Sequence, residues 1–304
     1  MTVDLRAAAV EHLAARRARG YRLADHDWLI RSFLDDLERR GMRRITVADA
    51  LAFALQRPGC HQRWQVTRLR VIRDLARYVH ELDPAAADLV PVGLIRARVV
   101  RRQPYLYSDE QVRALLAAAS ALSPARFAAT MQVFIGLLSV TGVRAGEAVS
   151  LAVADLDTHR QVLEVTGKYG KRRLVPLHPS TVEVLTDYLA DRPATGPLFV
   201  GTRGGRLNLG TAQRTFRALV GECHLTPRPG CGTPRLHDFR HSMAVRSLLD
   251  AQRSDTDVDA RVAVLADYLG HVDPACTYWY LSSTPELMAA VSERIAAFIP
   301  GAGR

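Results

Sequence analysis

The sequence predicts a mainly α-helical protein with a small antiparallel β-sheet, an α+β arrangement in two domains. Its 304 residues are enough for two domains of ordinary size. Apolar side chains recur at helical spacing along most of the chain, whereas strand-like alternation is confined to one hairpin. Apolar residues make up 48% and charged residues 24% of the chain, which excludes disordered, collagen-like and disulfide-scaffold proteins.

Residues 1–90 are predicted to form a helical domain. Apolar side chains at helical spacing predict one helix that ends before Gly41. Thr46 can cap a second helix, because Asp49 stands three residues later in the pattern of a capping box. A third helix is expected over 64–82, with apolar residues on one face and several arginines elsewhere.

The segment 91–107 (PVGLIRARVVRRQPYLY) is predicted to be an extended linker between the domains. It holds two prolines and four arginines but no acidic residue. Proline favours extended backbone, and a run of guanidinium groups can follow a phosphate backbone.

Residues 108–304 are predicted to form the second domain. Strands are expected over 162–166 and 172–177, around a hairpin turn at Gly167-Lys168-Tyr169-Gly170. The acidic stretch 250–259 is expected to form a loop. Helices are expected over 109–119, 125–140, 179–190, 208–221, 236–250, 258–269 and 285–298.

The charge of the chain favours a polyanionic partner, nucleic acid before membrane. Lysine and arginine total 41 against 31 acidic residues, a net charge of +10. Residues 1–107 carry 20 arginines and 12 acidic residues, a net of +8, which leaves +2 for residues 108–304. A solvated surface of an arginine-rich protein would give the same totals, so composition favours nucleic acid only modestly.

A cytoplasmic location is expected. The first 15 residues contain Asp4 and Glu11 and no apolar run, which is unlike a signal peptide. The most apolar stretch, 127–140, is too short to span a bilayer, so no membrane partner is expected. Four cysteines in 304 residues do not form a disulfide framework.

Two short segments carry cationic side chains in special positions. Arg144 follows Gly142, which ends a predicted helix, and Glu147 stands three residues later as an ion-pair partner. The only lysines of the chain, Lys168 and Lys171, share the hairpin turn. An ammonium group can give up its proton when it is desolvated, which a guanidinium group cannot do.

Two further segments carry histidines with an arginine or a tyrosine. His237 and Arg240 are three residues apart at a predicted helix start, where anions bind favourably. His271 leads to Tyr280, with Tyr278 two residues before it. These segments offer no carboxylate cluster for Mg²⁺. They suit a phosphodiester that cationic groups hold and a side chain attacks.

The order of these residues resembles the catalytic set of the tyrosine recombinases, the phage integrase family. TGVRAGEAVSL is similar to the arginine box of that family, and TGKYGKRRLVPL is similar to its β-hairpin, with Lys168 as the active-site lysine. LHDFRHSMA is similar to its His-x-x-Arg box. YLGHVDPACTYWY resembles its Leu-Gly-His box, with the nucleophile nine residues after His271. YWYLSSTPEL resembles recombinases of bacterial transposons and plasmid-borne elements more than the chromosome-dimer resolvases.

The resemblance implies a site-specific DNA recombinase with a helical DNA-clamping domain and an integrase-type catalytic domain. Arg144 and Arg240 would hold the non-bridging oxygens of the scissile phosphate. Tyr280 would attack phosphorus and form a 3′-phosphotyrosyl intermediate with a free 5′-hydroxyl. Because the intermediate keeps the bond energy, the reaction would need neither a metal ion nor ATP, and no cofactor is expected.

The resemblance also assigns the remaining residues of the site. Lys168 would protonate the leaving 5′-oxygen, and His237 would assist proton transfer with the nucleophile. His271 would hydrogen-bond the phosphate, and Glu147 would orient the first arginine. The predicted catalytic set is Arg144, Lys168, His237, Arg240, His271 and Tyr280.

The expected partner is double-stranded DNA. A recombinase of this family would act as a homo-oligomer on DNA, a tetramer, with companion recombinases as further candidates. The arginine-rich third helix and the linker supply the candidate DNA-contact residues. They are Arg68, Arg73, Arg96, Arg98, Arg101 and Arg102.

Three alternatives to a recombinase are considered. A type IB topoisomerase shares this set of residues, and a catalytically silent DNA-binding accessory protein would share the fold. A zinc site is the third, since Cys223, Cys231, His237 and His241 are all zinc-capable ligands. Their C-x₇-C-x₅-H-x₃-H spacing is too long between the cysteines for an ordinary finger, and zinc would consume His237.

Overall fold

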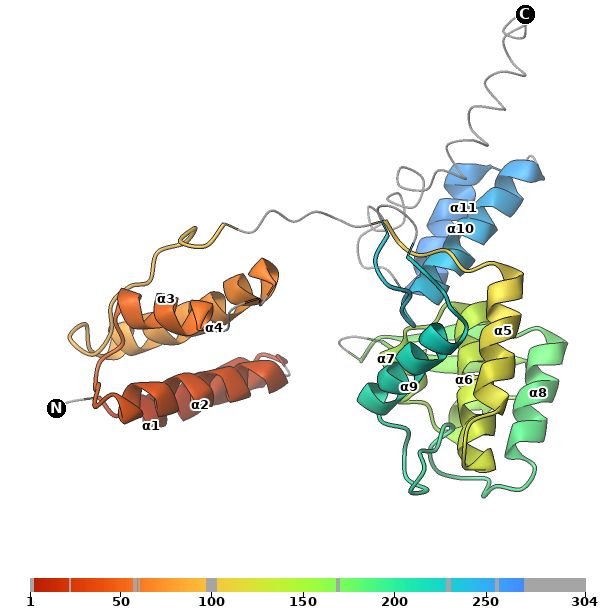
Figure 1. Cartoon of the computed structure of the whole chain (residues 1–304), viewed down its shortest axis with the longest axis horizontal. Helices are drawn as coiled ribbons and strands as arrows, with labels where there is room; N and C mark the ends of the chain where they lie inside the picture. The colour runs from red at the N-terminus through yellow and green to blue at the C-terminus, as the bar shows by residue number, and fades with distance from the viewer. Residues whose placement is uncertain are drawn as a thin grey trace, which may run out of the picture. The chain divides into compact units, whose positions relative to one another are not determined.

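The chain folds into two compact units, residues 1–101 and 102–304. The computed structural model describes residues 3–21, 23–56, 59, 61–96, 103–167, 170–227, 231–254 and 257–270. Helices dominate both units, and one small antiparallel sheet lies in the second (Figure 1). The predicted fold class, mainly α with a small antiparallel sheet, is confirmed.

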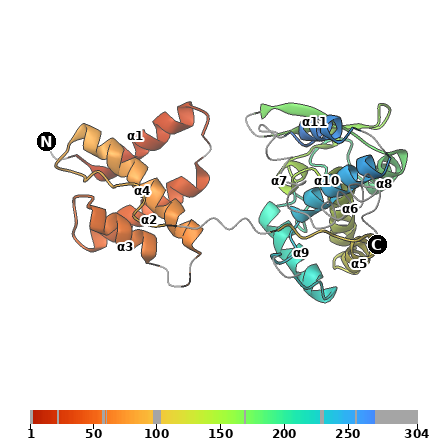
Figure 2. The same ribbon diagram turned by 90° about the horizontal axis from the view of Figure 1, so that it is seen from above.

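The first unit consists of four helices around one apolar core (Figure 2). Leu29, Phe33 and Ile72 are fully buried in this core, so the predicted apolar faces do face inward. The helices are α1 (Leu5–Ala18), α2 (Ala24–Arg39), α3 (Val47–Leu55) and α4 (Gln62–Leu82).

Side-chain caps fix where these helices begin. The Thr46 hydroxyl accepts from the Asp49 backbone N–H at 3.1 Å, and the Asp49 carboxylate accepts from the Thr46 N–H. The predicted capping box is therefore confirmed. Helix α1, for which the sequence analysis gives no separate range, begins in the same way, because Asp4 Oδ1 accepts from the Arg6 N–H at 2.8 Å.

The second unit holds seven helices, one short 3₁₀ turn and the sheet among its described residues. The predicted helices over 109–119, 125–140, 179–190, 208–221 and 258–269 are present to within one residue at each end. The elements are α5 (Asp109–Ser120), α6 (Ala125–Thr141), α7 (Ala145–Ala148), η1 (Val153–Asp155), β1 (Leu156–Asp157), β2 (Val162–Thr166), β3 (Arg172–Pro176), α8 (Pro179–Leu189), α9 (Leu209–Glu222), α10 (Asp238–Arg253) and α11 (Val258–Leu269). The helix expected over 285–298 lies outside the described residues.

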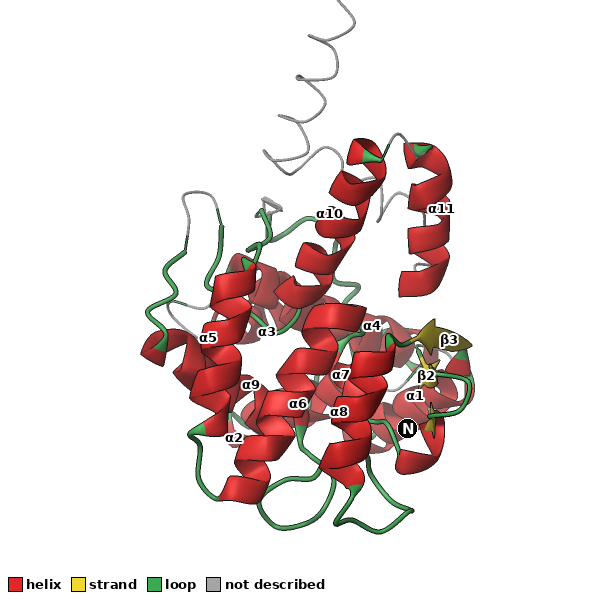
Figure 3. Ribbon diagram, turned by 90° about the vertical axis from the view of Figure 1, so that its right-hand side faces the viewer, coloured by secondary structure: helices red, strands yellow, loops and turns green. Residues whose placement is uncertain are grey.

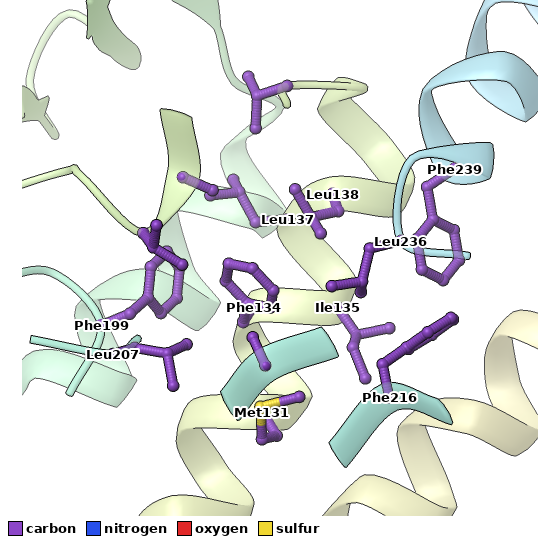
Figure 4. Packing of buried hydrophobic residues seen from close by; sticks show 14 of the residues in the cluster. Met131, Phe134, Ile135, Leu137, Leu138, Phe199, Leu207, Phe216, Leu236 and Phe239 are labelled. Atoms are coloured by element: carbon purple, nitrogen blue, oxygen red, sulfur yellow. The ribbon is translucent and has the colours of Figure 1, made fainter. Parts of the chain in front are cut away.

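Helix α6 contributes several large residues to the core of this unit. Its Phe134 and Ile135 are fully buried and pack with Phe199, Phe216 and Phe239 from other elements (Figure 4). Among the described residues, no helix combines the length and the apolar character needed to cross a lipid bilayer. The most apolar stretch of the sequence is thus the central core helix of the second unit.

The sheet has three antiparallel strands in the order β1-β2-β3. Strands β2 and β3 form the predicted hairpin, with Leu163 opposite Val175 and Val165 opposite Arg173. Leu163, Val165 and Val175 are fully buried, so this face of the hairpin points into the core. The register therefore places one arginine among apolar side chains on the inner face.

The last part of the predicted linker belongs to the second unit. Tyr105 and Tyr107 are 2% and 4% exposed and pack in its core. The Tyr107 ring stacks on Phe239 with centroids 4.3 Å apart, and its backbone N–H donates to Ser242 Oγ. The extended linker expected over 91–107 ends before these two rings, because aromatic side chains of this size are stabilised by burial.

Helices α10 and α11 lie side by side, with α10 against α6 and α11 against β3 (Figure 3). Val245, Leu248 and Leu265 form a small apolar cluster between them. The prediction of a loop over 250–259 is wrong at both ends. Helix α10 continues to Arg253, and Asp257 caps α11 by accepting from the Asp259 N–H at 2.9 Å.

Replacing Gly142 by alanine should lower the free energy of unfolding by about 1–2 kcal/mol, the usual penalty for an alanine in a left-handed conformation. Gly142 ends α6 with φ +62°, and an added Cβ would also lie 2.5 Å from the terminal methyl of Met243. Urea unfolding of the two proteins measures the difference.

Gly221→Ala is the matched control for this substitution. Gly221 is an exposed residue of α9 with no heavy atom within 4 Å of an added Cβ. It should raise the free energy of unfolding by about 0.5–1 kcal/mol. Equal effects of the two substitutions would contradict the role assigned to the positive φ of Gly142.

Candidate active site

The site begins where α6 ends and α7 begins. After Gly142 and the buried Val143, Arg144 occupies the N-cap of α7 in extended backbone, and Glu147 stands at the third helical position. Glu147 Oε2 accepts from the Arg144 backbone N–H at 3.1 Å, and Oε1 accepts from Arg144 Nη1 at 2.7 Å. One carboxylate therefore fixes both the start of α7 and the guanidinium of Arg144.

The same carboxylate binds a second arginine, Arg173 of strand β3. Arg173 Nη2 donates to Glu147 Oε2 at 2.7 Å, and the exposed fractions of the two side chains are 14% and 7%. Burial by itself would raise the pKa of Glu147, but hydrogen bonds from Arg173 and Arg144 outweigh it and lower the pKa. Glu147 is thus an anion at neutral pH, shared by two cations.

Arg240, in the first turn of α10, is 1% exposed. Its Nη1 donates to the Gly142 carbonyl at 3.1 Å and its Nη2 to the Leu269 carbonyl at 2.5 Å. Both of these partners are neutral carbonyl groups. Arg240 thereby ties the end of α6 to the end of α11, and these bonds do not neutralise its charge.

His237 lies at the N-cap of α10 and is exposed. Desolvation by the surrounding protein, followed by the positive charges of Arg240, Arg235 and Arg144, lowers its pKa from 6.5 to about 4. The imidazole is therefore neutral at neutral pH, with ring nitrogens that can accept a proton.

The turn before α10 is fixed by Asp238, whose side chain is fully buried. Its carboxylate accepts from the Arg235 backbone N–H at 2.8 Å and from Arg235 Nη2 at 2.9 Å. The Tyr107 hydroxyl donates to the Arg235 carbonyl at 3.0 Å from the other side. These bonds hold the backbone that presents His237.

A groove of about 450 Å³ opens beside Arg144 and His237. Helix α9 supplies one wall through Gln213 and Arg217, both exposed, and Arg235 stands at its edge. The groove is cationic and polar on these sides, which is suited to an anionic ligand. Its full lining is Arg144, Ala145, Gly146, Leu209, Gln213, Phe216, Arg217, Pro234, Arg235, Leu236 and His237.

The family of the chain follows from a comparison with family models. The model described as the phage integrase family matches residues 106–286, more than half of the chain. The chain belongs to the phage integrase family. The match includes the segments similar to the arginine box, the β-hairpin, the His-x-x-Arg box and the Leu-Gly-His box, so the resemblance to this family is confirmed.

Relatives extend the likeness of this phage integrase family member to almost its whole length. A Sinorhizobium fredii protein named as an integrase/recombinase, y4rB, is 39% identical over 306 residues, which cover 95% of this chain and 96% of that protein. The tyrosine recombinase XerC of Mycobacterium leprae is 30% identical over 297 residues, which cover 89% and 91% of the two chains.

A solved structure shares the fold of this integrase-family chain. It is the crystal structure of a lambda integrase dimer bound to a COC′ core site, with a TM-score of 0.62 at 19% identity. The match covers 91% of this chain and 77% of that one. At this level of identity the comparison shows a common fold.

The structure brings together three of the six predicted catalytic residues, Arg144, His237 and Arg240. The other three, Lys168, His271 and Tyr280, lie outside the described residues, and so does Tyr278. The residues that precede two of them, Gly167 before Lys168 and Gly270 before His271, lie at the site. A Cβ on Gly167 would lie 3.5 Å from Glu147 Oε1, and the Gly270 carbonyl accepts from Arg144 Nη2 at 3.4 Å.

Sequence reasoning did not single out Arg173 or Arg235. The alternation of strand β3 contains the signal for Arg173, because its side chain falls on the same face as Val175, which is fully buried. An arginine at an inward position of a strand needs an acidic partner, and Glu147 supplies it. Arg235 has a local signal as well, since Asp238 stands three residues later.

The prediction that Arg68 contacts DNA is wrong for the structure as described. Arg68 is 2% exposed, its guanidinium lies 4.0 Å from the centroid of the Phe53 ring, and its Nη2 donates to the Phe53 carbonyl. The residue supports the packing of α4 on α3. A guanidinium can be buried in this way because an aromatic face and a carbonyl replace its water.

The other predicted DNA-contact residues differ in their positions. Arg73 is half-buried on α4 and Arg96 is exposed. Arg98, Arg101 and Arg102 lie outside the described residues.

The candidate zinc ligands do not form a cluster in the described part of the chain. No group of three or more histidine, cysteine or acidic side chains there could hold a metal ion. The Cys231 thiol donates to the Pro104 carbonyl at 3.6 Å, and the rings of His237 and His241 lie edge to face with centroids 4.8 Å apart.

In the free protein His237 should titrate near pH 4, well below its ordinary value of 6.5. The unfolded chain binds this proton with an ordinary pKa, so protonation favours unfolding as the pH falls from about 6.5 towards 4. Duplex DNA should raise the pKa, because phosphate charge offsets the nearby arginines. NMR titration of ring-labelled histidines measures it, and the signal missing in His237→Gln identifies the residue. A value at or above 6.5 without DNA would contradict the described surroundings.

Proposed function

We propose that this integrase-family chain is a site-specific recombinase that cleaves and rejoins double-stranded DNA through a 3′-phosphotyrosyl intermediate. The observation that carries the proposal is the meeting of Arg144, His237 and Arg240, although nearly a hundred residues separate the first from the other two. Arg240 donates to the carbonyl of Gly142, two residues before Arg144. The fold thus assembles two guanidinium groups and a neutral imidazole beside a cationic groove.

The charges of the site support binding of a phosphodiester. The Arg144 side chain is 30% exposed, and its Nη2 donates to the Gly270 carbonyl at 3.4 Å. Arg240 donates to the carbonyls of Gly142 and Leu269, and these bonds hold its guanidinium in place without removing its charge. Two guanidinium groups placed in this way stabilise the charge of a pentacoordinate phosphorus more than that of the starting phosphate.

The reaction assigned to the site balances without an outside reagent. The Tyr280 oxygen forms a bond to phosphorus as the bond from phosphorus to the 5′-oxygen breaks. The tyrosine proton passes to a base, and the imidazole of His237 is unprotonated at neutral pH and can accept it. Lys168 gives the leaving 5′-oxygen its proton, and His271 hydrogen-bonds the phosphate. Rejoining is the reverse attack by a 5′-hydroxyl.

The first unit is proposed to hold the DNA. Arg63, Arg70 and Arg77 are exposed and seven residues apart, so they lie on nearly the same side of α4. With the basic segment 91–107 they supply a row of guanidinium groups for phosphate contacts. Assembly as a tetramer on DNA, help from companion recombinases and a cytoplasmic location stay predictions of the sequence.

The alternatives have less support. A type IB topoisomerase and a silent accessory protein share parts of the residue set, but the relatives matched over about nine-tenths of their length are named as recombinases. Covalent trapping separates the silent protein from an active one, and exchange of strands between duplexes separates a recombinase from a topoisomerase.

Tyr280→Phe should abolish the covalent protein–DNA adduct and leave DNA binding largely intact, because only the nucleophilic oxygen is lost. The substrates are duplexes tiled across the DNA that flanks the coding sequence, each nicked so that the released strand diffuses away. Adducts are counted on a denaturing gel with EDTA present, since the proposed reaction uses no metal. Tyr278→Phe is the matched control and should form the adduct. An adduct with Tyr280→Phe and none with Tyr278→Phe would reverse the assignment.

Lys168→Ala should slow cleavage by about 10²–10⁴-fold, the usual contribution of a general acid. Lys171→Ala, which changes the other lysine of the same turn, should have a much smaller effect. A 5′-bridging phosphorothiolate should restore cleavage by Lys168→Ala, because sulfur leaves without a proton. Failure of that rescue would exclude Lys168 as the acid and make Lys171 the next candidate.

A further inference from the structure

The C-terminal end of α11 is bound by three arginines from three different elements. Arg173 Nε donates to the Tyr268 carbonyl at 2.9 Å, Arg240 Nη2 to the Leu269 carbonyl at 2.5 Å, and Arg144 Nη2 to the Gly270 carbonyl at 3.4 Å. These are successive carbonyls at a helix end, where no intrahelical N–H reaches them. The negative end of the helix dipole also favours cations there.

The three contacts differ in how easily they can exchange. The bond from Arg144 to Gly270 is long and lies at an exposed side chain, so an arriving phosphate can replace the carbonyl. If the proposed function holds, Arg144 and Arg240 both direct N–H groups towards that phosphate, so their bonds to the end of α11 are exchanged or shared. The bond from Arg173 is the one of these three for which the phosphate does not compete.

Arg173 is placed to keep its contacts while the other two change theirs. It stands on the inner face of β3, opposite the fully buried Val165, and its side chain is 14% exposed. Its Nε is committed to Tyr268 and its Nη2 to Glu147, two partners that differ in position and charge. A planar guanidinium can satisfy both at once, which an ammonium group on a flexible stem cannot.

The backbone at Gly270 packs closely against the Arg173 side chain. A Cβ on Gly270 would lie 3.3 Å from Arg173 Nη1, 3.4 Å from its Cδ and 3.5 Å from its Nε. Gly270 has φ +65°, so it ends α11 in a conformation that glycine adopts without strain. Helix α11 therefore ends directly against the guanidinium of Arg173.

We propose that Arg173 is a positioning residue for Arg144. Through the Glu147 carboxylate it fixes the direction of the Arg144 guanidinium, and through the Tyr268 carbonyl it keeps the end of α11 in place when phosphate displaces the Gly270 carbonyl. Without Arg173, Glu147 would have Arg144 as its only described guanidinium partner and would draw that side chain away from the groove. The predicted effect of Arg173 on cleavage rests on the proposed function, whereas its role in anchoring the end of α11 does not.

The test compares Arg173→Gln with Arg172→Gln. Arg172 is the next residue on the same strand, its side chain is 73% exposed, and it pairs with Glu164 on the surface. Arg173→Gln should lower the single-turnover rate of adduct formation by about 10²-fold, the loss expected from a small misplacement of a reacting group. DNA affinity in a gel-shift titration should stay unchanged. Arg172→Gln should leave both quantities unchanged.

A substrate change separates positioning from a general structural role. When a methyl group replaces one non-bridging oxygen, the scissile linkage is neutral and gains less from a well-directed guanidinium. The loss caused by Arg173→Gln should therefore shrink on this methylphosphonate, as should the loss caused by Arg144→Ala. An equal loss on both substrates, no loss on either, or the same loss in Arg172→Gln would overturn the proposal.

Hydrogen exchange tests the anchor without DNA. In the full-length protein, backbone N–H groups of residues 266–270 should exchange faster in Arg173→Gln than in the wild type, and at the wild-type rate in Arg172→Gln. No difference would overturn the anchoring role. If the wild type forms no adduct with any duplex, the proposed function fails, and this measurement still decides whether Arg173 anchors α11.

Arg173→Lys covers the case in which Arg173→Gln does not fold. Lysine keeps the ion pair with Glu147 but cannot also hold the Tyr268 carbonyl in a fixed geometry. Cleavage should then fall by less than in Arg173→Gln, with the same shrinkage on the methylphosphonate and faster exchange at 266–270. Wild-type rates of cleavage and exchange in Arg173→Lys would overturn the proposal.

Discussion

The Glu147 carboxylate, shared between Arg144 and Arg173, is the interaction on which the rest of the site depends. It caps α7, fixes two guanidinium groups at 2.7 Å each, and is almost wholly buried. A buried anion is stable there only because two cations and a backbone N–H surround it. Loss of the carboxylate would leave Arg144 and Arg173 with like charges close together and no common partner.

The choice of partners for the arginines determines the net charge of the site. One carboxylate faces Arg144 and Arg173, whereas Arg240 donates to two backbone carbonyls and Arg144 and Arg173 each donate to one as well. Carbonyl groups hold a guanidinium in place by its N–H groups and remove none of its charge. These bonds fix the guanidinium groups and leave positive charge that attracts an anion. Desolvation, together with nearby arginine charges, keeps the imidazole of His237 neutral.

The sequence predicts most of this protein where the signal is local. The helix start at Thr46 follows from the side chain and its partner three residues later, and the capping box is present. The hairpin follows from alternation around a glycine-rich turn. The order of the motifs also predicts that Arg144, His237 and Arg240 share a site. It does so through the resemblance to the phage integrase family, because spacing in the sequence gives no distances between these residues.

The errors concern residues whose surroundings come from distant parts of the chain. The arginine-rich helix predicts a surface position for Arg68, but its place on α4 faces Phe53 of another helix. The composition of 91–107 predicts a linker that includes Tyr107, but this ring stacks on Phe239, more than a hundred residues later. The acidic partner of Arg173 is 26 residues before it. No spacing rule reveals such pairs, since burial of a long polar side chain depends on what the fold brings to it.

The hairpin between β2 and β3 has a consequence for chemical labelling. It carries both lysines of a chain that otherwise uses arginine for its basic side chains. Guanidinium groups do not react with amine-directed esters under mild conditions, because they stay protonated. Such a reagent can therefore attach only at this turn or at the N-terminal amine. A dye or crosslinker would report on this hairpin without any cysteine having to be introduced.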